Sequence, residues 1–303
     1  MMQNETKFVV GPGTVLDGAD GEAIAVFGSR IATFGSHQAT WWIDETTHTV
    51  DLPGIPVRGA RWSEDGATLL VGTGVVDTAA EVFTPVPALV EMVTPSPADH
   101  GSVVIHSTSW SVDGQHVAVL LKWSGPSSET GSAPPEKVVV IDLNNDTAPV
   151  EIPAEGASQI RIVGDRVVVG APVIRVWNFE GEQIAELSKT PGAPLSISGG
   201  DDGGPLIVID QDWSIRVVDT AEWTVKATWA GKFLGAVAVL NGVIAIDYQG
   251  TLLAGCIQNS AVREVGTFDT GILAAQLAAT ADNRLAILSA GEVHLMSFQL
   301  DCG

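Results

Sequence analysis

Cysteine and basic residues are both scarce in this chain. It holds two cysteines in 303 residues, and 15 Lys and Arg stand against 36 Asp and Glu, for a formal charge of −21. Two cysteines are too few for a disulfide framework. Affinity for phosphates comes from Lys and Arg, so this balance argues against a nucleic acid or an anionic membrane as partner. An acidic surface instead favours a basic protein partner or cations.

Long apolar runs are also missing. No run approaches the roughly 18 residues of a membrane-spanning helix. The start, MMQNETKFVVGPG, has no basic region followed by a long apolar stretch, the pattern of a secretory signal. We therefore expect a cytoplasmic protein. For Cys256 and Cys302, which lie in consecutive repeats, a pair is geometrically possible, but we expect two free thiols.

Patterns typical of enzymes and metal sites are absent as well. No Gly-rich phosphate loop follows a strand, and no Cys or His pair has metal-ligand spacing. Asp142, Asn144 and Asp146 alternate as in a calcium loop, but Pro153 stands where that loop needs a bidentate Glu. We interpret this segment as an Asx turn. The sequence predicts no cofactor, no metal and no catalytic residue.

What the chain does contain is a repeat: a turn dipeptide followed at once by a short apolar strand. The turns lie about 37 to 51 residues apart, the period of a β-propeller blade. Asp-Gly and Asn-Gly turns supply the positive φ that tight hairpins need. The seven dipeptides are Gly28-Ser29, Asp65-Gly66, Asp113-Gly114, Gly164-Asp165, Gly203-Gly204, Asn241-Gly242 and Asp282-Asn283.

This period predicts an all-β chain, a single domain of residues 1–303 folded as a seven-bladed β-propeller, with six or eight blades as the alternatives. Each blade would have four strands, apolar on both faces because it lies between neighbours. Trp62 and Trp110 occupy matching positions and are predicted core residues. The expected blades are 22–52, 58–93, 103–152, 158–187, 195–229, 233–266 and 272–298, the last completed by 7–10.

The two ends of the chain predict how the ring closes. The seventh unit lacks a fourth strand, while Lys7–Val10 (KFVV) precedes the first unit without a partner. We expect KFVV to form the outer strand of the last blade, since closure leaves no long exposed edge. Residues 272–279 (ILAAQLAA) favour helix by composition, so the first strand of the last blade is the weakest part of this assignment.

Two units carry a more specific motif. ARWSEDGATLLVGT (60–73) and TSWSVDGQHVAVLL (108–121) resemble the W-S-P-D-G repeat of WD40 and TolB-type propellers, and ATADNRLAIL (279–288) is a degenerate copy. The resemblance implies a propeller whose relatives mostly bind other proteins. His100 precedes the third blade at the spacing of the family's buried His, but the other members of that network are missing, so we interpret it as a loop residue.

A candidate partner site follows from two enlarged connections. Trp123 opens the polar insertion 124–136, and the connection 94–102 would emerge on the same face of a propeller. Insertions in repeats often lie on the binding face. Two loops without a role remain the alternative. The predicted site residues are Trp123, His100, Pro126 and Glu129, with Arg58 and His37 on neighbouring blades.

We therefore expect a non-enzymatic scaffold that binds a protein partner through loops near the third blade. One alternative is a propeller enzyme, a lactonase or hydrolase, with its site at the mouth of the central channel. Another is the propeller subunit of a larger sensor or secretion assembly. The sequence leaves open the partner's identity, the process and the oligomeric state.

Overall fold

Antiparallel strands make up almost all of the regular structure. The computed structural model describes residues 7–17, 21, 23–35, 37–43, 46–54, 60–93, 102–124, 135–145, 147–187, 192–200, 203–240, 242–272 and 276–302. The chain divides into two units. Unit 1 comprises Met1–Phe34, Ala39–His48 and Pro194–Gly303, and unit 2 comprises Gly35–Gln38 and Thr49–Ala193.

Unit 2 contains three four-stranded sheets, each in simple sequence order. Their strands are β6 (Arg61–Trp62), β7 (Thr68–Val71), β8 (Gly74–Asp77) and β9 (Val82–Pro85); β10 (Ser102–Trp110), β11 (His116–Ser124), β12 (Lys137–Asp142) and β13 (Val150–Pro153); and β14 (Gln159–Val163), β15 (Arg166–Gly170), β16 (Arg175–Asn178) and β17 (Gln183–Glu186).

Unit 1 holds most of the remaining strands. A sheet of order β18-β19-β20-β21-β25-β24-β23-β22 consists of two antiparallel groups joined at one parallel pair, Thr228 with Ala261. Its strands are β18 (Ser196–Gly199), β19 (Leu206–Ile209), β20 (Ile215–Asp219), β21 (Thr224–Trp229), β22 (Phe233–Val239), β23 (Gly242–Asp247), β24 (Thr251–Gln258) and β25 (Ala261–Asp269).

A further sheet, β2-β3-β4-β5, begins in unit 1, and its last strand ends in unit 2. Its strands are β2 (Ala23–Phe27), β3 (Arg30–Phe34), β4 (Gln38–Ile43) and β5 (Thr46–Asp51).

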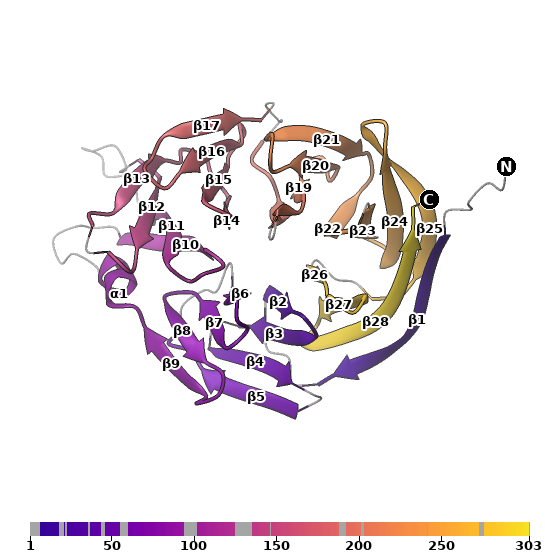
Figure 1. Cartoon of the computed structure of the whole chain (residues 1–303), viewed down its shortest axis with the longest axis horizontal. Helices are drawn as coiled ribbons and strands as arrows, with labels where there is room; N and C mark the ends of the chain where they lie inside the picture. The colour runs from indigo at the N-terminus through magenta and orange to yellow at the C-terminus, as the bar shows by residue number, and fades with distance from the viewer. Residues whose placement is uncertain are drawn as a thin grey trace. The chain divides into compact units, whose positions relative to one another are not determined.

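The pairing of the first strand with the last is confirmed. β1 (Lys7–Leu16) runs antiparallel to β28 (Glu292–Asp301), with Lys7 opposite Asp301 and Leu16 opposite Val293. Figure 1 shows the two strands side by side, indigo beside yellow. The sheet order is β1-β28-β27-β26, with β27 at Arg284–Ser289 and β26 at Gln276–Ala279. The helix-favouring segment thus contributes a strand, and its residues 273–275 lie outside the described part.

The end of the second repeat differs from the prediction. Four strands were expected across 58–93, but they end at Pro85, and Pro87–Val93 forms helix α1. Pro87 suits the first helical position because its fixed φ matches a helix and its missing N–H would be unpaired there anyway. Leu89 is fully buried and packs in one cluster with Trp110 and Ile105. Burial of Leu89 fixes the helix against the sheet of β10.

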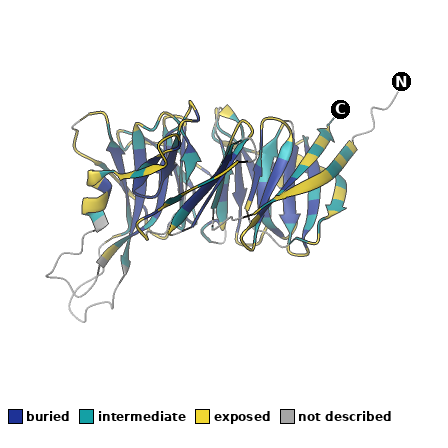
Figure 2. Cartoon of the chain, turned by 90° about the horizontal axis from the view of Figure 1, so that it is seen from below, coloured by how far each residue is buried: buried dark blue, intermediate teal, exposed yellow. Residues whose placement is uncertain are grey.

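The core lies along the inner strands. β15 and β23 are buried over nearly their whole length, whereas β1 has no buried residue and β25 has one, Val262. Figure 2 shows β1, the first strand after the N label, in the colours of exposed and intermediate residues. The predicted core residues Trp62 and Trp110 are 3% and 1% exposed, which confirms that assignment. Strands buried on both faces explain why the sequence shows continuous apolar runs and little alternation.

The three motif copies share one hydrogen-bond arrangement. Ser63 Oγ donates to Asp65 Oδ1 at 2.6 Å and accepts from Thr68 N at 3.0 Å. Ser111 with Asp113, and Thr280 with Asp282, repeat both contacts. The turn positions Gly66 and Gly114 have φ of 65° and 70°, as the hairpin prediction requires. In each copy the hydroxyl thus links the turn carboxylate to the first backbone N–H of the second strand and fixes where that strand begins.

The cysteine prediction is wrong. Cys256 and Cys302 form a disulfide with a Cα–Cα distance of 5.5 Å. β24 carries the buried Cys256, and Cys302 directly follows β28, so the bond joins two neighbouring sheets of unit 1. The two cysteines lie 46 positions apart in the sequence, and the packing of one sheet against the next brings them together.

Candidate interaction surfaces

Of the six residues predicted for a partner site, the structure describes Trp123 and His37. His100, Pro126, Glu129 and Arg58 lie outside the described residues. Trp123 is half-buried on β11 and lies opposite Val103 of β10. One residue further, Ser124 lies opposite Ser102, so the two enlarged connections leave the sheet from adjacent positions.

Lys122, the residue before Trp123 in the chain, forms an ion pair. Lys122 Nζ lies 3.5 Å from Glu136 Oε1, and Glu136 Oε2 accepts a hydrogen bond from Gly156 N at 2.8 Å. Val103, opposite Trp123, is 38% exposed. An aromatic ring, an exposed aliphatic side chain and a positioned ion pair thus mark this end of β10 and β11.

His37 lies in a different setting. It is exposed, its carbonyl oxygen accepts a hydrogen bond from Leu52 N at 2.7 Å, and its ring lies against Gly54. These contacts place His37 beside the segment that follows β5. Sequence reasoning grouped it with Trp123, but the structure places it against Leu52, which lines the groove described next, and Gly54.

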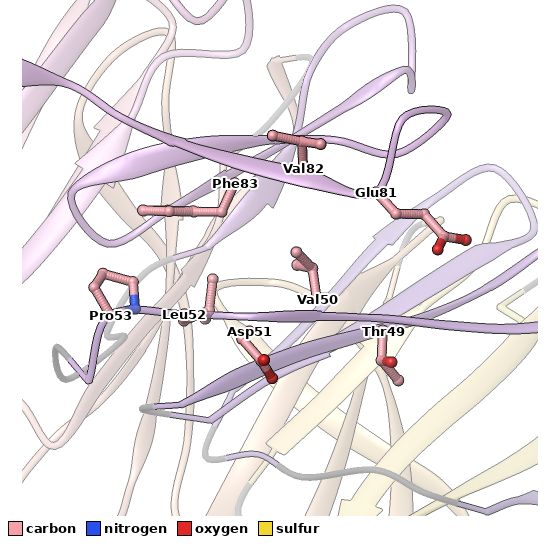
Figure 3. A pocket seen from close by; sticks show the side chains of 8 residues that line it. All are labelled: Thr49, Val50, Asp51, Leu52, Pro53, Glu81, Val82 and Phe83. Carbon is pink, nitrogen blue, oxygen red and sulfur yellow. The ribbon is translucent and has the colours of Figure 1, made fainter.

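An open groove of about 630 Å³ runs between β5 and β9. Its walls are Thr49, Val50, Asp51, Leu52 and Pro53 on one side and Glu81, Val82 and Phe83 on the other. Figure 3 shows Val50 and Leu52 pointing toward β9, with Thr49 and Asp51 on the opposite side of β5.

The groove combines an apolar floor with exposed acids. Leu52 is 8% exposed, whereas Val82 is 50% exposed. Asp51 and Glu81 are exposed carboxylates, and the lining contains no basic side chain. β5 and β9 each come last in the order of their sheets. Sequence reasoning missed this surface because its residues belong to two repeats and form no motif.

A second exposed surface, in unit 1, is aromatic. Trp213 and Tyr248 are 40% and 55% exposed, and Lys232 Nζ lies 6.0 Å from the centroid of the Tyr248 ring. Trp213 has a φ of 68°, and its carbonyl oxygen accepts a hydrogen bond from Phe233 N at 3.1 Å. The turns of two successive four-strand groups thus present their aromatic side chains to solvent.

The carboxyls whose pKa values are lowered accept hydrogen bonds within turns. Hydrogen bonds from Asn145 and Asn144 lower the pKa of Asp142, which confirms the Asx turn predicted there. Hydrogen bonds from Ser214 lower the pKa of Asp212 in the same way. Within the described ranges, no three His, Cys, Asp or Glu residues gather as a metal site would require. No helix in that part of the chain has the length and apolar character to cross a membrane.

Comparison with known proteins identifies solved structures with a similar fold. No family model and no curated protein matches the chain. Among solved structures, a chain of the mitotic checkpoint complex has a TM-score of 0.68 at 12% identity, covering 98% of this chain and 94% of that one. The Cps50 (Swd1) β-propeller domain of Myceliophteria thermophila has a TM-score of 0.68 at 12% identity, covering 94% and 99%. The WD40 propeller of Doa1 has a TM-score of 0.62 at 14% identity, covering 96% and 97%.

The chain has the WD40-type β-propeller fold. The resemblance that the three turn motifs carry is thereby confirmed at the level of fold. This WD40-like propeller departs from the motif by lacking Pro in its turns, yet Ser63 and Ser111 make the same hydrogen bonds in both full copies.

Proposed function

We propose that residues 1–303 form a single seven-bladed propeller closed by β1. The support is the strand pairing: every group has four strands, and the eight-stranded sheet divides into two such groups at one parallel pair. Pairing of β1 with β28 gives the last group its fourth strand. Counting groups this way favours seven blades over six or eight.

We further propose a non-enzymatic scaffold that binds a protein partner. The observation that carries this proposal is the likeness to WD40 propellers over at least 94% of the chain in three solved structures. One of them belongs to the mitotic checkpoint complex, an assembly of proteins. A stack of buried sheets fixes the positions of its surface segments, so a partner binds with little ordering cost.

The partner site of this proposal lies near the third blade, at Trp123 and the connections that leave the sheet beside it. Aromatic residues dominate binding hot spots, and Trp123 is half-buried beside the exposed Val103. The formal charge of −21 favours a partner with a basic segment and disfavours nucleic acid and anionic membranes. Cytoplasmic residence remains part of the proposal, and the thiol measurement given in the Discussion tests it.

Affinity purification with quantitative mass spectrometry tests the scaffold. The test variant combines Trp123→Ala with a shortened 125–134 connection, and the control is Trp223→Ala, a half-buried tryptophan of unit 1. We expect the wild type and the control to recover the same partner and the test variant to lose it. Recovery of no specific partner by the wild type overturns the scaffold. Equal recovery by all three proteins overturns the site near Trp123.

A further inference from the structure

The groove described above is lined by two strands, β5 and β9, that both lie at the edge of a sheet. Both walls are the outermost strands of their sheets. An outermost strand offers backbone N–H and C=O groups along its free side, and proteins normally protect such edges. Here both edge strands line one open groove of about 630 Å³.

The side chains along β5 alternate in character. Val50 and Leu52 point to one side, and Thr49 and Asp51 to the other (Figure 3). A strand that adds to the edge of a sheet places its own side chains on the same two sides, because successive residues point to opposite faces. Its apolar residues would meet Val50, Leu52 and Phe83, and its alternate residues would meet Thr49 and Asp51.

The acidic residues of the lining favour basic residues at the alternate positions of an added strand. Asp51 and Glu81 are exposed acids, the lining carries no base, and the whole chain has a formal charge of −21. Lys or Arg at the alternate positions would pair with Asp51 on contact, while Glu81 and the net negative charge of the chain would attract them over distance. An acidic peptide would be repelled.

We propose that this groove binds an extended peptide segment of a partner, with apolar and basic residues in alternation, as an added strand on the edge of β5. The proposal rests on the scaffold function and names a partner chemistry and a surface separate from Trp123.

Fluorescence anisotropy tests the proposal with labelled, capped heptapeptides. The probe alternates Lys and Val. A second peptide alternates Glu and Val, and a third carries Pro at the centre of the Lys-Val sequence, which removes a backbone donor and breaks an added strand. We expect saturable binding of the probe and at least tenfold weaker binding of the other two peptides.

Charge-reversal variants locate the binding. Asp51→Lys with Glu81→Lys alters the groove, and Glu222→Lys with Glu264→Lys is the matched control at exposed acids of unit 1. Reversing two exposed charges turns two weak attractions into repulsions, so we expect about tenfold weaker probe binding in the groove variant. The groove variant should also bind the Glu-Val peptide more tightly than the wild type does, which a merely misfolded protein would not do.

Three results would overturn the proposal: no saturable binding of the probe to the wild type, equal binding of the probe and the Pro peptide, or equal binding by the groove and control variants. Each leaves the scaffold standing if the purification above still recovers a partner. Failure of that purification overturns the scaffold whatever the peptides do.

Discussion

Asp210 and Arg216 form a buried two-point ion pair in unit 1. Arg216 Nε donates to Asp210 Oδ2 and Arg216 Nη2 to Asp210 Oδ1, each at 2.7 Å, and the side chains are 8% and 6% exposed for Arg216 and Asp210. Burial raises the pKa of Asp210, against the opposing effect of Arg216. The Asp210 carbonyl oxygen also accepts from Trp213 N, so the pair anchors the turn that exposes Trp213.

Removing one partner of this pair leaves a buried charge without compensation. We expect Arg216→Met to lower the free energy of unfolding by about 3–5 kcal/mol. Replacing both residues, Asp210→Leu with Arg216→Met, should cost less than the single change, because no buried charge remains. Urea denaturation followed by tryptophan fluorescence measures both. A double variant as unstable as the single variant would contradict this account.

The turn at Asp113 predicts that the free energy of unfolding depends on pH. Burial raises the pKa of Asp113, but hydrogen bonds from Ser111 and Gln115 outweigh it, and the pKa lies below the ordinary 3.8. A carboxyl whose folded pKa is lowered stabilises the protein above its unfolded pKa and loses that contribution as pH falls through the folded pKa.

We therefore expect Asp113→Asn to cost about 1 kcal/mol at pH 7. The difference from the wild type should shrink as the pH falls below about 4. Urea melts at a series of pH values measure it, with Glu155→Gln, an exposed residue, as control. A difference that stays constant down to pH 2 would show that the charge of Asp113 contributes nothing.

The Cys256–Cys302 disulfide closes a loop of 46 residues. In the chain-entropy estimate such a loop stabilises the folded state by about 4 kcal/mol, so reduction should lower the melting temperature clearly. A Cys302→Ser variant should melt at the same temperature with and without reductant. An unchanged melt of the wild type under reduction would contradict the stabilising role.

The oxidation state of Cys256 and Cys302 in the cell also tests the expected cytoplasmic residence of the protein. Disulfides persist in oxidising compartments and are rare in the cytoplasm, so this bond and the expected cytoplasmic residence point to different environments. Alkylating free thiols in intact cells before lysis decides between them. Fully alkylated Cys256 and Cys302 would support the cytoplasm, and protection of both would contradict it.

Phe83 reaches the groove only because Gly74 has no side chain. A Cβ at Gly74 would lie 2.4 Å from Phe83 Cζ and 2.5 Å from the Thr84 carbonyl oxygen. We expect Gly74→Ala to lower stability by about 1–3 kcal/mol through overpacking and to weaken binding of the Lys-Val probe. Gly28→Ala, where nothing lies within 4 Å but φ is 58°, controls for backbone strain alone. Equal effects of both changes would contradict the packing account.

The repeat period predicted the sheets because each blade follows one local rule, a turn such as Asp113-Gly114 followed by an apolar strand. The partner for Lys7–Val10 was predictable by elimination, since the last unit lacked a strand. Helix α1 could not be predicted from the sequence, because it is only a few residues long. Leu89 is buried by Ile105 and Trp110 of another strand, which no pattern within the helix reveals.

The candidate sites were harder to predict for the same reason. The disulfide and the groove each join residues from two repeats, and neither leaves a pattern along the chain. Sequence reasoning identified His37 but not its neighbours Leu52 and Gly54, which contact it only after β5 has paired. Four of the six predicted site residues lie outside the described ranges, so the site near Trp123 stays a prediction.

The closed ring proposed above is tested most directly by hydrogen exchange with mass spectrometry after deletion of residues 1–11. In a closed ring the pairing of β1 with β28 stabilises all blades together, so the deletion should speed exchange in β11 and β15 of unit 2 as well as in β26–β28. The melting temperature should fall sharply. Faster exchange confined to β26–β28, with unit 2 and the melt unchanged, would contradict the closed propeller.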